Sequence, residues 1–463
     1  MARIVALFTG ILLAGTAAWA EDDAPRLAFG TDGARQMSIA WNTALDTPQF
    51  AEVRALDGEW IRHPAARQEW AAMNRFIHEV AVSDLQPNTN YEYRVGDGAT
   101  WSAVHSFVTG PVDPCQPFRF AALGDDRSQD EFGPSLNWAP ILEEALGEDP
   151  AFVINGGDLV MTGSDAVQWY NWLHHTGPLL NSIPHMPAIG NHDDDRVEGD
   201  EAHYNRVFSL PRNDITETED FYYFTYGDLI VVVISTATYT GNGLAEQADW
   251  LDRVLTENPK RWKVVDMHHP IYTSDLFGLM HEPNEVGQNA ALVPIFDRHH
   301  VDLVIQSHNH WYQRFLPSFG GGGGGDAVPV DEAADGTVYV TTGGAGAFTV
   351  DFGDLGDLAL GADCLSTDGC ALLRGEHHFI LFEMEANRLT GTVRATAAQN
   401  FGMDEGNREI IDEFELIKRG DERIDCENRP PPDPPPVVDA GAPPLADAQL
   451  PGIRDAALPE PDA

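Results

Sequence analysis

The stretch Gly190-Asn191-His192-Asp193 is the most specific of five short polar blocks in this chain of 463 residues. An asparagine makes a poor core residue, and here it stands between a glycine and a His-Asp pair. The other four blocks are Gly124-Asp125-Asp126-Arg127, Gly157-Asp158, Val265-Asp266-Met267-His268-His269 and His308-Asn309-His310. Apolar runs that predict buried strands precede them, at Phe118–Leu123, Ala151–Ile154, Lys263–Val265 and Val301–Ile305. Because α/β folds place reactive groups at the carboxyl ends of parallel strands, we expect the blocks to meet in one site.

The side chains in these blocks are typical of a site with two metal ions. Carboxylate and amide oxygens mixed with imidazoles suit divalent ions such as Zn, Mn or Fe. Two such ions together activate a water and neutralise a phosphoryl group in transit. His192 would donate to a leaving oxygen, and Asp193 would hold the tautomer of His192. Any one of these motifs alone would more often be a turn or a surface group, so the prediction depends on their combination and order.

The charge of the chain restricts its partners. With 28 Lys and Arg against 73 Asp and Glu, the net charge is −45. Such acidity argues against a nucleic-acid-binding surface and against binding to anionic membranes. A small phosphorylated substrate is also an anion, so bound metal ions are the expected source of local attraction. The oligomeric state cannot be read from the sequence.

The first residues predict export. Met1-Ala2-Arg3 is a short positive start, Ile4–Leu13 is apolar, and Ala18-Trp19-Ala20 fits the small-x-small cleavage rule, so we expect a signal peptide over residues 1–20 and a secreted or periplasmic protein. The alternative is a retained membrane anchor, although the apolar run is short for a membrane span. No later stretch approaches that length.

Four cysteines in an exported chain favour disulfides, with three possible connectivities. Cys364 and Cys370 flank the turn signal Asp368-Gly369, so we pair them, which leaves Cys115 with Cys426. Free buried thiols are the alternative.

Residues 25–112 predict an all-β domain. Strand-like stretches recur at Gln36–Trp41, Ala51–Arg54, Phe76–Val82, Tyr91–Val95 and Val104–Val108. The segment Leu85–Val95 resembles the Leu-x-Pro-x-Thr-x-Tyr stretch of fibronectin type III domains, in which the tyrosine bonds back to upstream backbone. The domain would serve either as a binding module or, as we favour, as a scaffold for the domain that follows.

Residues 116–418 alternate strand-like and helical patterns, the layout of an α/β domain. Expected helices are Ser135–Leu146, Asp165–Leu180 and Ala245–Leu255. Expected strands are Phe221–Ser235 as a pair joined at Gly227-Asp228, Val338–Thr342, and a closing hairpin of His378–Glu385 with Arg388–Thr396. The run Gly320–Gly325 is interpreted as a spacer or a loop over the site. Residues 419–463, rich in Pro, Ala and Asp, predict a disordered acidic tail.

Residues 25–418 resemble the purple acid phosphatases and their bacterial relatives in the calcineurin-like metallophosphoesterase superfamily. The resemblance is carried by Gly190–Asp193, by His268-His269-Pro270-Ile271-Tyr272, by Val301–Arg314, and by Gly343-Gly344-Ala345-Gly346 after a strand. It implies a fibronectin type III-like β-sandwich followed by a four-layer α/β/β/α domain. By position it also implies ligands for two ions: Asp125, Asp158 and His310 for the first, and Asp158, Asn191, His268 and His308 for the second. His192 would be an acid or phosphate contact, and His281 a second substrate histidine.

Two positions depart from the pattern of that family. Purple acid phosphatases carry a tyrosine three residues after the second aspartate, where this chain has Met161, so the tyrosinate that gives the purple colour is missing. Other members of the superfamily supply a histidine two residues after the first aspartate, where this chain has Arg127. An arginine is not a metal ligand. It would contact the substrate phosphate or turn away to a surface carboxylate, and the first metal site would be weak or completed by water.

We therefore expect an exported, binuclear metal-dependent phosphoesterase. A hydroxide held by the ions would attack phosphomonoesters in line, with catalytic contributions from His192, Asp193, His281 and Arg127. The alternatives are hydrolysis of phosphodiesters or nucleotides at the same site, and a non-catalytic surface binding protein that retains the fold.

Overall fold

The structure is a computed structural model that describes residues 25–128, 134–194, 202–237, 243–274, 284–320, 336–349, 368–396, 399–400, 403–404 and 408–426. The expected signal peptide, His281, Cys364 and the predicted tail beyond Cys426 lie outside the described residues. The glycine run is described only at its first residue, Gly320. Among the residues that are described, no helix is long and apolar enough to cross a membrane.

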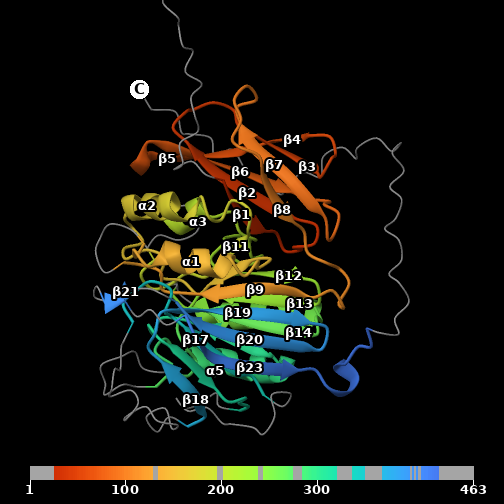
Figure 1. Ribbon diagram of the computed structural model, residues 1–463, viewed down its shortest axis with the longest axis vertical. Coiled ribbons are helices and arrows are strands. Elements are labelled where there is room, and N and C mark those ends of the chain that lie inside the picture. The colour runs from red at the N-terminus through yellow and green to blue at the C-terminus, as the bar shows by residue number, and fades with distance from the viewer. Residues whose placement is uncertain are drawn as a thin grey trace, which may run out of the picture. The chain divides into compact units, whose positions relative to one another are not determined.

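The first domain is a sandwich of two four-stranded antiparallel sheets (Figure 1). One sheet has the order β1 (Arg26–Phe29), β2 (Met37–Thr43), β6 (Arg75–Val82) and β5 (Ala66–Trp70); the other has β4 (Ile61–Pro64), β3 (Phe50–Ala55), β7 (Asn90–Gly96) and β8 (His105–Val108). The five expected strands are β2, β3, β6, β7 and β8. The backbone N–H of Gln86 donates to the Tyr91 hydroxyl at 2.8 Å, which confirms the expected tyrosine corner.

The missed strands of this sandwich are short. β1 and β4 have four residues each and β5 has five, and β4 and β5 are mostly exposed. Exposed edge strands lack the apolar alternation that identifies a half-buried strand. Their existence therefore depends on the neighbouring strands that they pair with.

The second domain is built on two stacked mixed sheets. The six-stranded sheet has the order β11 (His185–Pro187), β10 (Val153–Asn155), β9 (Phe118–Leu123), β19 (His378–Glu385), β20 (Arg388–Ala395) and β23 (Ile410–Ile417), and its last four strands run side by side in Figure 1. The seven-stranded sheet has the order β12 (Tyr222–Tyr226), β13 (Leu229–Ile234), β14 (Trp262–Met267), β15 (Leu303–Gln306), β17 (Val338–Thr342), β16 (Tyr312–Phe315) and β18 (Cys370–Arg374). A separate small pair joins β21 (Gln399–Asn400) and β22 (Met403–Asp404).

Strand β13 shows why the two sheets pack into four layers. Leu229, Val231 and Val233 face the six-stranded sheet and join the cluster that contains Phe120 and Ile380. Ile230, Val232 and Ile234 face the opposite way, where they meet side chains of α4 (Gly243–Glu257) and α5 (Gln288–His299). Successive residues of a strand point to opposite faces, so a continuous apolar run belongs to a strand covered on both sides. Since α1 (Trp138–Leu146) packs on β19 of the other sheet, the order of layers is α/β/β/α, as expected.

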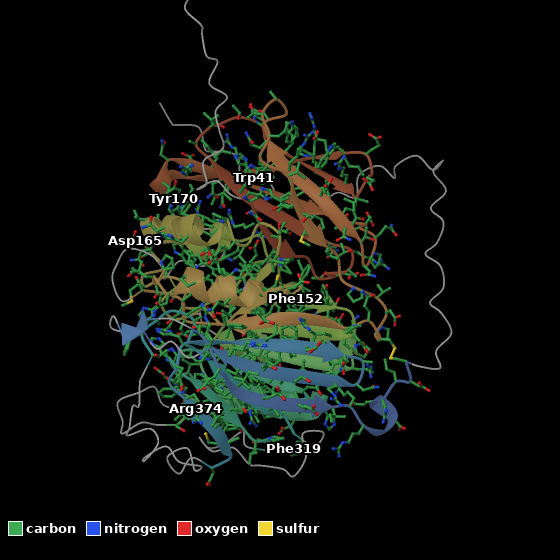
Figure 2. The ribbon with its side chains drawn as sticks, in the orientation of Figure 1. Trp41, Phe152, Asp165, Tyr170, Phe319 and Arg374 are labelled. Atoms are coloured by element: carbon green, nitrogen blue, oxygen red, sulfur yellow. A yellow bond between two sulfur atoms is a disulfide. The ribbon has the colours of Figure 1, made fainter. Side chains whose placement is uncertain are left out.

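The sandwich and the α/β domain share one continuous core. Phe152 contacts the rings of Phe29 in β1, Phe120 in β9 and Phe224 in β12, and so joins the sandwich to both sheets of the second domain (Figure 2). The Tyr93 hydroxyl donates to the carbonyl of Asn181 at 2.6 Å. Such shared packing supports the scaffold interpretation of the first domain.

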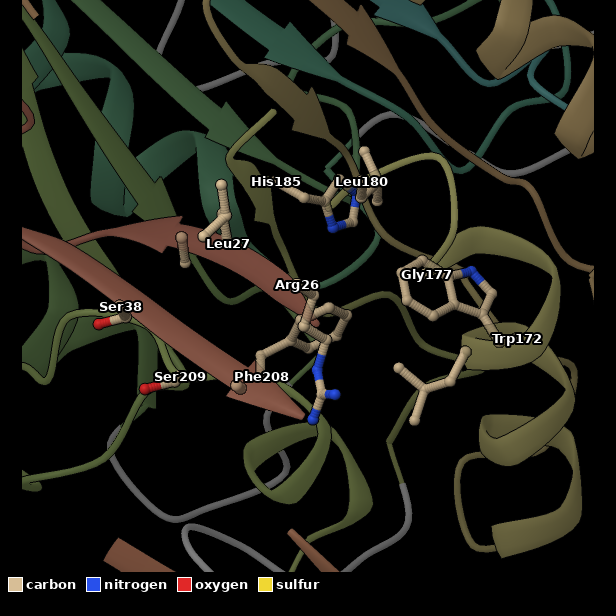
Figure 3. A pocket seen from close by; sticks show the side chains of 12 residues that line it. Arg26, Leu27, Ser38, Trp172, Gly177, Leu180, His185, Phe208 and Ser209 are labelled. Atoms are coloured by element: carbon tan, nitrogen blue, oxygen red, sulfur yellow. The ribbon is translucent and has the colours of Figure 1, made fainter. Parts of the chain in front are cut away.

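A small cavity lies at this junction, lined by residues of β1, β2, α2 (Ala166–Thr176) and the segments around β11 (Figure 3). The rings of His185, Phe208 and Trp172 contact one another in its wall. His185 is buried, and neither of its ring nitrogens has a hydrogen-bond partner among the described residues. Phe208 follows the short helix α3 (His203–Val207).

A disulfide closes the second domain. Cys115 and Cys426 are bonded across 311 residues of sequence, which confirms the expected pair. Cys370 is also disulfide-bonded, while its expected partner Cys364 is outside the described residues. The compact unit extends past residue 418 to Cys426. Residues 419–426 form a short 3-10 turn, Gly420–Glu422, and bond to Arg261 and Asn387.

Candidate metal centre

The polar blocks follow five strands from both sheets, and their carboxyl ends meet. β9, β10 and β11 run parallel in the first sheet, and β14 and β15 run parallel in the second. Two hydrogen bonds connect the sheets at this edge. The backbone N–H of His308 donates to Asp125 Oδ2 at 2.9 Å, and His268 Nδ1 bonds to the carbonyl oxygen of Gly156 at 2.8 Å. Residues almost two hundred positions apart therefore share one buried site.

Three site residues hold a left-handed backbone. Asp125 and Asp158 have φ of 60° and His308 has φ of 72°. Residues other than glycine rarely adopt this conformation, and they do so most often at functional sites, where the surrounding structure supports the strain. Each of the three lies two or three residues past the end of a strand, where the backbone turns sharply. Gly190 supports one of these turns, because a Cβ there would lie 2.2 Å from Asp158 Oδ1.

Four side chains converge on what we call the second cation site: Asp158, Asn191, His268 and His308. His268 Nε2 lies 3.0 Å from Asn191 Oδ1, 3.3 Å from Asp158 Oδ1 and 3.1 Å from His308 Nδ1. His268 and His308 are buried, and the other nitrogen of His268 is fixed by the Gly156 carbonyl. Such an outer hydrogen bond orients a ligating imidazole. The lone pair of the other ring nitrogen is then free to bind a metal ion.

The first cation site comprises Asp125, Asp158 and His310, whose potential ligand atoms all lie within 4.8 Å of one another. Asp125 Oδ1 is buried without a hydrogen-bond partner among the described residues, and His310 Nε2 lies 3.4 Å from it. His310 Nδ1 bonds to the Phe348 carbonyl at 3.0 Å, so Nε2 carries the lone pair that faces the site.

Arg127 lies inside this first site. Its Nε donates to Asp158 Oδ2 at 3.0 Å, its Nη2 lies 3.5 Å from His310 Nε2, and its Nη1 lies 3.3 Å from Met161 Sδ. The side chain is only 9% exposed. The alternative in which Arg127 turns away to a surface carboxylate is therefore wrong. Its ion-pair partner is the buried carboxylate that both sites share.

Asp193 has a different role from the expected one. The His192 ring bonds through Nδ1 to the carbonyl oxygen of Met161 at 2.9 Å, and not to Asp193. Asp193 Oδ2 instead accepts the backbone N–H groups of Asp158 and Gly190, and Oδ1 accepts those of Leu159 and Val160. A buried carboxylate with four backbone donors holds the loop of Asp158 in shape, so Asp193 positions a neighbour and does not orient the His192 ring.

Burial and neighbouring charges together set the ionisation of the two facing aspartates. It raises the pKa of Asp125 to about 8; the positive charge of His268 opposes this and the charge of Asp158 adds to it. Burial also acts on Asp158, but the charges of His268, His192 and Arg127 outweigh it and lower the pKa of Asp158 below its usual range. Two buried carboxylates this close ionise together only when a cation compensates them.

The sequence interpretation missed some neighbours of the site. Glu285 Oε2 lies 3.3 Å from His308 Nε2, and the ring centroid of His269 lies 4.4 Å from that of His308. Asp126, beside Asp125, accepts from Trp172 Nε1 at 2.6 Å and from Asn155 Nδ2 at 3.1 Å. His269 and Asp126 were visible in the polar blocks as second polar residues next to an expected ligand. Glu285 lies outside every block and had no signal of its own.

Comparison with known proteins agrees with this architecture. The profile of the purple acid phosphatase N-terminal domain matches residues 23–109, and that of the calcineurin-like phosphoesterases matches residues 82–312. An uncharacterised protein of Mycobacterium tuberculosis is 26% identical over 375 residues, which cover 69% of this chain and 68% of that protein. Purple acid phosphatase 23 of Arabidopsis thaliana is 26% identical over 60% of this chain and 65% of its own length. The solved structure of a purple acid phosphatase from yellow lupin seeds superposes with a TM-score of 0.69 at 20% identity, over 85% of this chain and 74% of that one.

The second domain of the chain belongs to the calcineurin-like phosphoesterases. The chain has the two-part architecture of the purple acid phosphatases, with their N-terminal domain ahead of the α/β domain. That family implies a dinuclear metal centre. The second cation site fits this expectation, because a carboxylate, an amide oxygen and two imidazoles converge there with their donor atoms adjacent. The first site fits less well, because a guanidinium contacts two of its three donors.

Proposed function

We propose that the protein is an exported metal-dependent phosphoesterase that hydrolyses phosphomonoesters. One observation carries the proposal: donor atoms of Asp158, Asn191, His268 and His308 converge from the ends of strands in both sheets. Structural packing alone does not require a mixed set of amide, carboxylate and imidazole groups in a buried position. Such a set suits Zn, Mn or Fe.

The side chains have separate proposed roles. Asp158, Asn191, His268 and His308 would hold one ion, and Asp125, Asp158 and His310 are the candidate ligands of another. Bound ions would supply charge neutralisation for the phosphoryl oxygens and lower the pKa of the attacking water. The protein itself would orient the ligands, through Asp193 on the Asp158 loop and through the Gly156 carbonyl on His268.

His192 is the proposed proton donor to the leaving group. Its backbone N–H bonds to Asp158 Oδ1 at 2.9 Å, which fixes the residue next to the second cation site. Its Nδ1 bonds to the Met161 carbonyl, so Nδ1 carries a hydrogen and Nε2 is the atom that exchanges a proton with the substrate. His281, outside the described residues, is a further candidate for substrate contact.

Charge favours monoesters over diesters. A phosphomonoester carries up to two negative charges, and Arg127 adds a permanent positive charge beside the proposed ions. A diester has one charge fewer to be compensated. Diesterase or nucleotide hydrolase activity is the second candidate, because the same ligand set would serve it.

Paired assays would test the activity. Full-length protein treated with chelator and reloaded with Zn²⁺ or Mn²⁺ should hydrolyse p-nitrophenyl phosphate with a higher kcat/KM than bis-p-nitrophenyl phosphate. His268→Ala should abolish both activities, whereas His174→Ala, an exposed histidine on α2, should change neither. A preference for the diester would reassign the substrate class. Folded, metal-loaded protein without any hydrolysis would favour the non-catalytic alternative.

We also propose that the protein acts outside the cytoplasm. The signal-like residues 1–20 and the disulfide between Cys115 and Cys426 support this together, because disulfides persist in oxidising compartments. N-terminal sequencing of the expressed protein should find Glu21 first. A mature chain that still begins at Met1 and stays in the cytoplasm would contradict the proposal.

A further inference from the structure

We infer that the guanidinium of Arg127 takes the position of the first cation, so that the protein holds a single exchangeable metal ion at the second cation site. The inference rests on the proposed function only in taking the same side chains as metal ligands. It replaces a centre of two ions with a centre of one metal ion and one fixed organic cation.

The contacts of Arg127 are those that a first ion would make. Nε donates to Asp158 Oδ2 at 3.0 Å, and Nη2 reaches His310 Nε2, the lone-pair nitrogen, at 3.5 Å. The backbone N–H of Arg127 also donates to the carbonyl oxygen of Asp158 at 3.0 Å. Hydrogen bonds to Asp158 therefore hold both the main chain and the side chain of Arg127. Of the three donors in the first site, only Asp125 has no contact with the guanidinium, and one carboxylate is too small a ligand set to hold an ion tightly.

Met161 completes the pocket for the guanidinium. Its Sδ lies 3.3 Å from Arg127 Nη1. A thioether is a weak acceptor without charge and adapts to the shape of its neighbour. The two positions at which the chain departs from the purple acid phosphatase pattern therefore touch each other. The neutral side chain of Met161 allows the cationic side chain of Arg127 to lie beside it.

The shared carboxylate divides its two oxygens between the two sites. Asp158 Oδ1 faces His268 Nε2 at 3.3 Å, on the side of the second site, while Oδ2 accepts from Arg127. An arginine stays charged at every accessible pH. A divalent ion placed in the first site would meet this charge at contact distance in a buried environment, where repulsion is strong. The guanidinium and a metal ion are therefore alternative occupants of the first site.

The arrangement also predicts what Arg127 does for a substrate. Its contacts to Asp158, His310 and Met161 leave further N–H groups on both Nη atoms. These groups are aligned in the planar fork that matches phosphate oxygens. Arg127 would thus bind the phosphoryl group that the metal ion at the second site also contacts.

Metal stoichiometry tests this inference without any measurement of activity. Full-length protein would be stripped with a chelator, titrated with Mn²⁺ by calorimetry, and analysed for bound metal after dialysis. The wild type should bind a single ion per chain and give the electron paramagnetic resonance signal of isolated Mn²⁺. Arg127→His, which removes the guanidinium and supplies an imidazole, should bind a second ion and give the signal of an exchange-coupled pair. Arg127→Lys keeps a cation and should remain at one ion, as should the control Arg314→Ala, whose partner Asp412 is in β23.

Two results would overturn the inference. One is a wild type that binds two ions per chain with similar affinity; the other is a folded Arg127→His that still binds one. If Arg127→His does not fold, the stoichiometry of the wild type decides alone. Hydrolysis by a two-ion wild type would reject the inference and keep the proposed function, whereas one bound ion without hydrolysis would keep the inference and reject that function.

Discussion

The carboxylate of Asp193 holds the backbone of Asp158 in place: Asp193 Oδ2 accepts the Asp158 N–H at 2.7 Å. The same carboxylate accepts from Leu159, Val160 and Gly190, so one buried side chain connects the loops that follow β10 and β11. The geometry of the shared metal ligand therefore depends on a residue that does not face the site.

This relationship predicts the effect of Asp193→Asn. The amide would present N–H groups to backbone donors and leave some of them buried and unpaired, which costs about 1–3 kcal/mol for each. We expect a lower melting temperature even in chelator-treated protein, together with weaker Mn²⁺ binding. An unchanged melting temperature of the metal-free protein would contradict the structural role of Asp193.

A second prediction separates Asn191 from His192. Asn191→Ala removes an oxygen that faces His268 Nε2 and should weaken metal binding. His192→Ala should leave metal binding unchanged but lower kcat by roughly a hundredfold or more on an alkyl phosphate, whose leaving group needs a proton. The measurements are metal titration and kinetics with alkyl and p-nitrophenyl phosphates. Equal loss of metal by both variants would show that His192 acts on the site geometry and not on the leaving group.

The third prediction concerns colour. The position that would carry a coordinating tyrosine is Met161, and the nearby Tyr204 and Tyr222 hydroxyls both donate to the Pro187 carbonyl. Protein loaded with Fe³⁺ should therefore lack an intense visible charge-transfer band. Absorption spectroscopy of the iron-loaded wild type tests this. Met161→Tyr should give such a band only when Arg127 is also replaced, because the guanidinium contacts Met161 and occupies the first cation site. A purple wild type would mean that a tyrosine coordinates iron from elsewhere.

The fourth prediction concerns the cavity beside β1. Burial lowers the pKa of His185 to about 3, whereas a histidine in the unfolded chain titrates near 6.5. As the pH falls from about 6.5 toward 3, the unfolded chain binds a proton that the folded chain does not, so stability falls by about 1.4 kcal/mol per pH unit.

His185→Phe should remove this loss, because a ring that does not titrate would fill the same apolar surroundings of Trp172 and Phe208. The melting temperature of the variant should fall less than that of the wild type between pH 7 and pH 5. His174→Phe, on the exposed side of α2, should keep the wild-type slope. If the melting temperatures of His185→Phe and the wild type fall equally between pH 7 and pH 5, His185 takes up its proton in the folded state.

Secondary structure was predicted best where an element is buried and its sequence is correspondingly apolar. Strand β13 is a continuous apolar run that is buried throughout, and strands β9 and β14 are mostly apolar and mostly buried. Helix α5 was missed because Pro294 interrupts its pattern. Strands β16, β18 and β23 were missed because they are short or partly exposed, and pairing with neighbours decides such strands.

The polar blocks and their order along the chain predicted which residues gather at one site. Asp125, Asp158, Asn191, His268, His308 and His310 each lie just past a strand or its loop, and chain topology brings those ends together. The contacts of Asp193 and Arg127 could be seen only in the folded chain. A carboxylate accepts hydrogen bonds from any donor within reach, and a guanidinium pairs with any buried anion. Both interactions depend on distances across separate loops, such as the 2.7 Å from Asp158 N to Asp193 Oδ2 and the 3.0 Å from Arg127 Nε to Asp158 Oδ2, and only the folded chain sets these distances.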